Sequence, residues 1–318
     1  MTDRPTFGER ARAVAELLRV SNVLTAVADV WMGMIVATGA MPDWRVAAPL
    51  TAACVLIYLA GMVLNDAFDA PRDAIERPTR PIPSGRISRT TAAWLGAALM
   101  KLGLACGAVA AFVSQASASL LAIAVLCVLV LLYDSRLKAT PFGPPVMGLC
   151  RGANAAAGLL VMVPLAVAPK SFTPLPPDQA GAIVFGLTMY FMGLTYFARN
   201  EAVGGRRPML LLSIGVSLGG LVQLAAWPLR AEEPGLLITE FRWLVLWAVV
   251  AMLVGRRYVA AVLQPSPRTV QAAVGNAITS VIIIDAALAF GYAGQFWGLA
   301  IFALLPPTLL MSRFVPQT

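Results

Sequence analysis

Acidic residues gather in one short stretch of this sequence. Asn65 is followed by Asp66, Asp69, Asp73 and Glu76, so that four of the sixteen acidic residues fall within eleven positions. Carboxylates this close together repel one another unless a cation lies between them. In a continuous helix Asn65, Asp69 and Asp73 share one face, with neighbouring Cβ atoms about 5 to 6 Å apart. Their oxygens suit Mg²⁺, which keeps several waters and is often completed by phosphate oxygens of a substrate.

Two other interpretations of this stretch stay open. Pro71 lacks an N–H group, so the helix could end near Ala70 and leave Asp73 off the common face. The cluster could also be a solvated acidic loop that holds no metal.

A basic, proline-rich segment follows at once. It reads Arg77-Pro-Thr-Arg80-Pro-Ile-Pro-Ser-Gly-Arg86 and cannot be helical throughout. Guanidinium groups bind phosphate oxygens well. Carboxylates for a metal and arginines for phosphate, on one connection, are the two halves of a metal-diphosphate site.

A second polar stretch runs from Tyr133 through Asp134 to Lys138, and an apolar segment after it carries Arg151 and Asn154. The last two are three residues apart and share a helix face. An ionisable group in an apolar segment is costly, so Arg151 is expected to face a polar cavity or a partner. Lys138 alone fits a helix-end charge equally well.

The elements that position these residues are membrane helices. The chain has 318 residues, 59% hydrophobic and only 13% charged, with a mean hydropathy of +0.77. That is more apolar surface than one water-soluble core can bury. We predict an all-α, polytopic bundle of nine to ten spans, forming a single domain over 1–318 around a central cavity open to the cytoplasmic side. The predicted spans are 22–39, 47–65, 90–112, 118–134, 145–168, 180–198, 209–228, 240–258, 272–291 and 294–311. The last two are so close that one of them could be re-entrant.

Charge asymmetry predicts the orientation. Eighteen Lys and Arg residues lie on one set of alternate connections and four on the other. This places both termini, and the acidic and basic connection, on the cytoplasmic side of the inner (cytoplasmic) membrane. The net charge of +8 is therefore mostly topological, and no nucleic-acid partner is expected. The N-terminal end does not look like a removable signal peptide.

Some catalytic systems are excluded by composition. There is no histidine, which removes Ser-His-Asp and Cys-His nucleophiles and most catalytic zinc sites. The four cysteines match no metal motif and are predicted to be small core residues. Three isolated charges, Asp29, Lys101 and Asp285, lie inside predicted spans. We expect Lys101 to pair with one of the two aspartates.

Taken together, these motifs resemble the UbiA superfamily of intramembrane prenyltransferases. The family signature Asn-Asp-x-x-Asp-x-x-x-Asp fits 65–73, and Arg-Pro-x-Arg-Pro-(Leu/Ile)-Pro-Ser-Gly fits 77–85. A Tyr-x-x-x-x-Lys element fits 133–138 and an early Arg-x-x-Asn fits 19–22. The resemblance covers nearly the whole chain. The stretch from Tyr133 and the Met-Gly-Leu-Cys-Arg-Gly-Ala-Asn segment are most similar to the EboC branch.

The resemblance implies an enzyme that transfers a prenyl group from a prenyl diphosphate to an aromatic or other lipophilic acceptor within the membrane, using Mg²⁺. The implied metal ligands are Asn65, Asp66, Asp69 and Asp73, and the implied catalytic residues are Asp69, Asp73, Arg80 and Lys138. The implied substrate-binding residues are Asn22, Arg80, Tyr133, Lys138, Arg151, Asn154, Arg199 and Glu201. The rings of Tyr133, Tyr196 or Phe197 could stabilise an allylic cation, but anchoring at the membrane interface also explains them and is the simpler interpretation.

One departure from the family concerns its second aspartate motif. In this chain the corresponding region, 195–207, holds Glu201 as its only acid. Either one metal suffices, with Arg199, Arg206 or Arg207 binding the diphosphate, or activity is weakened or lost. A protein that binds or transports isoprenoid lipids on the same fold without chemistry is therefore the alternative function. Membrane lipid surrounds the chain under either function.

Overall fold

The computed structural model describes residues 7–161, 175–199, 207–230 and 235–314, with the side chains of 13–161, 175–199, 207–230 and 235–313. In these residues the regular structure is helical. The helices in chain order are α1 (Phe7–Leu18), α2 (Val23–Thr38), α3 (Trp44–Glu76), α4 (Arg89–Ser114), α5 (Ser117–Leu132), α6 (Gly143–Leu159), α7 (Pro177–Ala198), α8 (Arg207–Ala226), α9 (Glu240–Leu263), α10 (Pro267–Ala293), α11 (Gln295–Phe302) and α12 (Leu305–Phe314).

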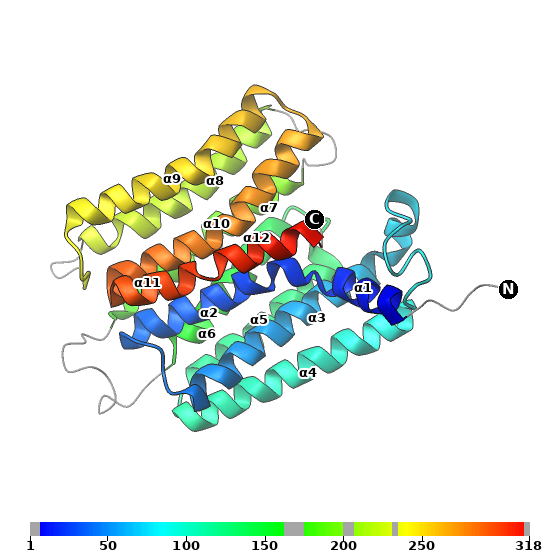
Figure 1. Cartoon of the computed structure of the whole chain (residues 1–318), viewed down its shortest axis with the longest axis horizontal. Coiled ribbons are helices and arrows are strands. Elements are labelled where there is room, and N and C mark those ends of the chain that lie inside the picture. The colour runs from blue at the N-terminus through cyan, green and yellow to red at the C-terminus, as the bar shows by residue number, and fades with distance from the viewer. Residues whose placement is uncertain (1–6, 162–174, 200–206, 231–234, 315–318) are drawn as a thin grey trace.

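The described helices confirm the prediction of an all-α transmembrane bundle. Nine stretches in the described part of the chain are long and apolar enough to cross a membrane. The predicted span 145–168 appears as α6, which has 17 residues and is about 26 Å long; its remainder from 162 lies outside the described residues. The last predicted span is divided into α11 and α12, which follow one another along the bundle (Figure 1).

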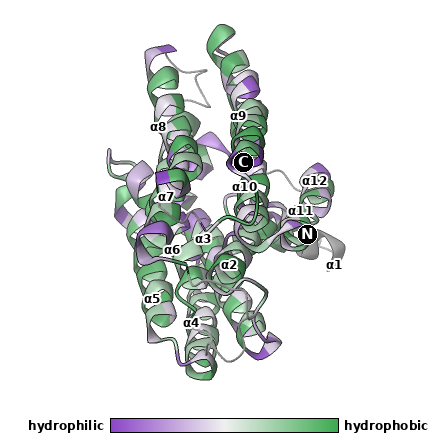
Figure 2. Ribbon diagram, turned by 90° about the vertical axis from the view of Figure 1, so that its left-hand side faces the viewer, coloured by the Kyte–Doolittle hydropathy of each residue, from purple (hydrophilic) through white to green (hydrophobic). Residues whose placement is uncertain are grey.

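The helices form layers, with α2, α6 and α10 in the interior. Figures 1 and 2 place α8 and α9 at one edge of the molecule and α4 at the opposite edge. Hydrophobic residues dominate the helices in Figure 2, and many large apolar side chains on the outer helices are exposed, as expected for a surface that faces lipid. All four cysteines are free, and three of them are buried, in line with the prediction.

α2 and α6 cross with almost no side chains between them. A Cβ atom on Gly33 would lie 2.5 Å from the carbonyl oxygen of Ala155 and 2.8 Å from the backbone nitrogen of Leu159. A Cβ atom on Gly158 would collide in the same way with the backbone of Val30 and Met34. Small residues allow this close approach of membrane helices. The crossing brings the polar residues of α6 against those of α2.

α3 passes through Pro71 and ends at Glu76, so the possible helix end near Ala70 is not observed. Pro71 cannot donate to the carbonyl of Ala67, four residues earlier. The Nε atom of Arg89, at the start of α4, donates to that carbonyl at 2.9 Å. An arginine from the next helix therefore satisfies the acceptor that Pro71 leaves free, and the last turns of α3 stay helical.

The proline-rich connection after α3 is a series of turns, as predicted, and is anchored to the bundle. Ile82 is buried in an apolar cluster with Ala67 and Ala70 of α3. Gly85 adopts φ +76°, a conformation that favours glycine. Arg86 pairs with Glu16 of α1 at 2.9 Å. These contacts fix the backbone that follows Arg80.

Candidate functional site

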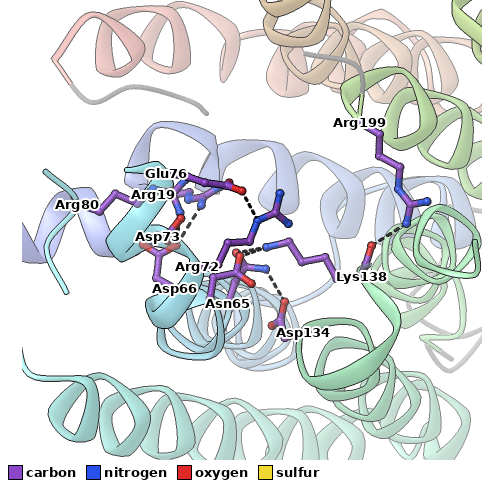
Figure 3. Close-up of polar contacts among 11 residues, drawn as sticks. Arg19, Asn65, Asp66, Arg72, Asp73, Glu76, Arg80, Asp134, Lys138 and Arg199 are labelled. Carbon is purple, nitrogen blue, oxygen red and sulfur yellow. Dashed lines mark hydrogen bonds and ion pairs between the residues drawn. The ribbon is translucent and has the colours of Figure 1, made fainter. Parts of the chain in front are cut away.

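The sequence-predicted polar residues meet at one end of the bundle, where α3, the connection after it and the end of α5 come together (Figure 3). The Nζ atom of Lys138 donates to Oδ1 of Asn65 at 3.0 Å and also contacts Oδ2 of Asp69. Two oxygens from successive turns of α3 thus converge on one cationic nitrogen. The spacing predicts that Asn65, Asp69 and Asp73 converge on one cation; Asn65 and Asp69 do so here, whereas Asp73 contacts Arg80 instead.

The other two aspartates form a separate group around Arg80. Its Nη1 atom lies 2.7 Å from Oδ2 of Asp73 and 3.3 Å from Oδ1 of Asp66. Arg19, which precedes α2, adds a second guanidinium contact to Asp66 at 3.1 Å. Asp66 and Asp73 are buried, with exposed fractions of 4% and 5%. Burying a carboxylate costs free energy unless a cation pairs with it. Arg80 and Arg19 are those cations here.

The four predicted metal ligands therefore lie in two pairs on α3. Within the described residues, no three acidic or sulfur-bearing side chains converge in a group that could hold a metal ion. Each pair nevertheless presents two oxygens to a single cation, the ammonium of Lys138 or the guanidinium of Arg80. Mg²⁺ is commonly bound through one or two carboxylates, with waters and substrate phosphate oxygens. The donor set fits that ion.

A π-helical turn, Tyr133–Leu137, joins α5 to Lys138. The N–H of Lys138 bonds to the carbonyl of Tyr133, five residues earlier, at 2.9 Å. Asp134 is buried in this turn and accepts a hydrogen bond from Nδ2 of Asn65 at 2.7 Å. Such turns are frequent at functional sites. Here the turn presents Tyr133, Asp134 and Lys138 to α3.

A cavity of about 100 Å³ starts beside this group and extends between α2, α3, α5 and α6. Asn65, Tyr133 and Asp134 line one end, and Arg151 and Asn154 lie deeper along α6. The remaining lining residues are Ala26, Cys54, Ile57, Tyr58, Gly61, Met62, Leu126, Val130, Met147 and Cys150. Arg151 lines this cavity, in the kind of place that the sequence predicts for it, and the apolar walls suit a hydrocarbon chain.

The inner end of the cavity is backed by a buried charge cluster. Nη1 of Arg151 pairs with Oδ2 of Asp29 at 3.2 Å, and Nδ2 of Asn154 donates to the same oxygen at 3.0 Å. The carboxyl of Asp285 on α10 lies beside that of Asp29. The expected pairing of Lys101 is wrong, because that side chain lies on the exposed face of α4 and Arg151 pairs with Asp29 instead. The cluster joins the three interior helices.

Arg199, at the end of α7, contacts the loop that follows Lys138. Its Nη2 atom donates to the carbonyls of Lys138 at 2.7 Å and Thr140 at 2.5 Å. A Cβ atom on Gly143 would lie 2.5 Å from that nitrogen, so glycine leaves room for it. Tyr196 adds a hydrogen bond to the carbonyl of Pro141 at 3.2 Å. Arg199 thus supports the loop that carries Lys138.

The remaining predicted residues lie further from Lys138 and the α3 carboxylates, or outside the residues that the structure describes. Asn22 is buried at the end of a short 3₁₀ turn, three residues after Arg19. Phe197 is buried against Tyr258, with ring centroids 4.8 Å apart, whereas Tyr133 lines the cavity. Glu201, Asn200 and Arg206 lie outside the described residues.

Sequence reasoning did not assign two residues that the structure places in the site. The sequence motifs include Arg19 only as part of the Arg-x-x-Asn element, and Asp134 only as a neighbour of Tyr133. Their contacts with Asp66 and Asn65 span 47 and 69 residues of sequence. The position of Asp134 four residues before Lys138 is the available signal, because both then face the same side of a helix.

Comparison with known proteins agrees with this geometry. The sequence profile of the UbiA prenyltransferase family matches residues 26–273. The chain belongs to this family. As a member of the UbiA family, it is a multi-pass membrane protein with the family's helical fold. The match does not distinguish branches of the family, so the resemblance to the EboC branch stays a prediction.

Named relatives match a part of the chain. Digeranylgeranylglyceryl phosphate synthase of Methanopyrus kandleri is 38% identical over 136 residues, covering 43% of this chain and 48% of the relative. The enzyme of the same name from Thermococcus kodakarensis is 34% identical over 152 residues, or 48% and 53% of the two chains. The matches thus span about half the length of these curated relatives.

Solved structures match over more of the chain. A UbiA homologue from Archaeoglobus fulgidus bound to GPP and Mg²⁺ has a TM-score of 0.63 at 16% identity, covering 92% of this chain and 99% of its own. A structure of digeranylgeranylglyceryl phosphate synthase has a TM-score of 0.62 at 18% identity, covering 90% and 99%. These likenesses confirm the predicted fold.

Proposed function

We propose that this protein transfers a prenyl group from a prenyl diphosphate to an aromatic or other lipophilic acceptor, with Mg²⁺ as cofactor, as one domain of the cytoplasmic membrane with both termini cytoplasmic. One observation carries the proposal. The two oxygen pairs on α3 and three cationic side chains, Lys138, Arg80 and Arg19, lie at the end of the bundle where an apolar cavity starts at Asn65. A charged head and a hydrocarbon tail require these two environments side by side.

The donor would bind with its tail in the cavity and its diphosphate at the polar group. Each CH₂ buried along Ile57, Val130 and their neighbours contributes about 0.8 kcal/mol. Asn65, Asp69, Asp66 and Asp73 are the residues that would hold Mg²⁺. When bound, the ion neutralises negative charge on the diphosphate and polarises its oxygens.

The cationic side chains then act on the leaving group. As the C–O bond to the prenyl carbon breaks, its electron pair goes to the diphosphate, and Lys138 and Arg80 stabilise the developing charge. The ring of Tyr133 lies on the cavity wall, where it can stabilise an allylic cation. The apolar walls exclude water, so that the prenyl carbon bonds to the acceptor instead, and the acceptor releases a proton.

Arg199, in the region 195–207 that corresponds to the family's second aspartate motif, has a supporting role in this proposal. Arg199 supports the Lys138 loop through two backbone carbonyls, and so acts on the diphosphate through Lys138.

The names of the relatives suggest glycerol phosphate ether lipids as one acceptor class to test beside aromatic acceptors. Arg151 and Asn154, at the inner end of the cavity, are the polar groups available to such an acceptor.

The test uses purified protein in lipid nanodiscs with Mg²⁺ and radiolabelled prenyl diphosphates of ten to twenty carbons. Wild type is compared with Asp69→Asn and Asp73→Asn. Glu76→Gln is the matched control, because Glu76 lies on the same helix but pairs on the surface with Arg72. We expect Mg²⁺-dependent release of diphosphate that falls by about 100-fold or more in the two aspartate variants. Tight donor binding without turnover for every acceptor would instead support a lipid-binding or transport protein.

A further inference from the structure

Asp134 is a buried carboxylate between the polar group and the cavity. Its exposed fraction is 9%, and it lines the cavity beside Tyr133 and Asn65. Its Oδ1 atom accepts from Asn65, while Oδ2 is buried and has no hydrogen-bond partner among the described residues. A carboxylate kept in so apolar a place requires an explanation beyond the packing of α5.

The explanation lies in the amide of Asn65, whose two ends have opposite hydrogen-bonding character. The ammonium of Lys138 can only donate, and it contacts Oδ1 of Asn65 at 3.0 Å. The carboxylate of Asp134 accepts, and it contacts Nδ2 at 2.7 Å. If the amide turned over, two donors would oppose each other at Lys138 and two acceptors at Asp134. The amide is therefore held in one orientation from both sides.

The π-helical turn supplies both partners from one segment. Asp134 and Lys138 are four residues apart, and both side chains reach Asn65 on the facing helix (Figure 3). If a metal displaced the ammonium of Lys138 from Oδ1, only Asp134 would still fix the amide.

We propose that Asp134 is a positioning residue that keeps Oδ1 of Asn65 directed at the metal-diphosphate site. The inference rests on the proposed function, in which Asn65 is a ligand of Mg²⁺. Partners that orient a metal ligand in this way are typically worth 10- to 100-fold in metal affinity or activity.

The first experiment measures the Mg²⁺ concentration that gives half-maximal binding of geranyl diphosphate to purified protein in detergent, by calorimetry. Asp134→Leu removes the acceptor at similar volume, whereas Asp134→Asn keeps an oxygen that can accept from Asn65. Ser135→Ala is the control, because the exposed hydroxyl of Ser135 donates to the carbonyl of Leu131 in the same segment and points away from Asn65 in sequence register. We expect a 10- to 100-fold higher Mg²⁺ requirement for Asp134→Leu, and a change within about threefold for Asp134→Asn and Ser135→Ala.

A second pair of variants exchanges the two side chains and keeps the test decisive if Asp134→Leu does not fold. Asn65→Asp alone opposes two carboxylates and should raise the Mg²⁺ requirement. Adding Asp134→Asn to it restores a donor and an acceptor in reversed order, and should recover at least about tenfold.

Three results have distinct meanings. An unchanged Mg²⁺ requirement in Asp134→Leu, equal loss in Asp134→Leu and Asp134→Asn, or no recovery in the exchanged pair would overturn the positioning role. Wild-type protein that binds geranyl diphosphate without any dependence on Mg²⁺ would instead overturn the proposed function on which this role rests.

Discussion

The contact between Arg89 and the carbonyl of Ala67 predicts a coupling with Pro71 that can be measured. Replacing Arg89 by Met leaves that carbonyl without a donor, because Pro71 has no N–H. Hydrogen bonds that involve a charged group contribute about 1.5 to 3 kcal/mol, and this one lies at a partly exposed helix end. We therefore expect Arg89→Met to lower the unfolding free energy by about 1 to 2 kcal/mol.

The same substitution should have almost no effect when Pro71 is replaced by Ala. The new N–H then donates to Ala67 within the helix, so Arg89 is no longer needed. Pro71→Ala alone should be stabilising, since an interior proline costs about 3 kcal/mol or more. The coupling energy in the double-mutant cycle should be about 1 to 2 kcal/mol.

The assay is denaturant unfolding in detergent micelles, followed by circular dichroism, for wild type, the two single variants and the double variant. Arg136→Met is the matched control, because Arg136 is exposed in the π-helical turn. Prenyl transfer should fall in Arg89→Met and recover in the double variant, because Asp73 lies beyond Pro71 on the same helix. An equal cost of Arg89→Met with and without Pro71 would refute the reasoning.

Three further predictions concern the site. Lys138→Met should lower kcat by about 100- to 1000-fold in the prenyl-transfer assay. It should change the unfolding free energy by less than about 1 kcal/mol, because the paired side chains of Lys138 and Asp69 are 32% and 22% exposed. A loss of folding would contradict this. Arg151→Leu should lower the unfolding free energy by about 3 to 5 kcal/mol in denaturant unfolding, since it leaves the buried carboxylate of Asp29 without its cationic partner. An equal loss of unfolding free energy in Asp285→Asn would argue against a specific pair of Arg151 and Asp29. Arg199→Gln should lower kcat about tenfold through the Lys138 loop; a change in KM for the donor alone would instead indicate direct binding.

The transmembrane fold could be predicted from composition and periodicity because these report which side chains must avoid water. The number of spans followed from the same signal, and the acidic and basic motif identified the correct end of α3. Hydropathy could not show that the last span divides into α11 and α12, because both halves are apolar.

Partners that come from other helices could not be predicted. Whether α3 continues past Pro71 depends on Arg89, eighteen residues later in the sequence. The choice of Arg151 over Lys101 as the partner of Asp29 depends on which faces of α4 and α6 point inward. A charge in an apolar segment indicates that a partner exists, but only the packing shows which residue it is.

The glycine crossing of α2 and α6 also restricts how the protein can open. Two backbones in such close contact cannot slide past each other without atomic overlap, so we expect this pair to move as one rigid unit with Asp29, Arg151 and Asn154 on it. Widening of the cavity for a bulky lipid must then come from displacement of α3 and α5 on the opposite side. We therefore expect the wall formed by α2 and α6 to keep its shape when a ligand binds.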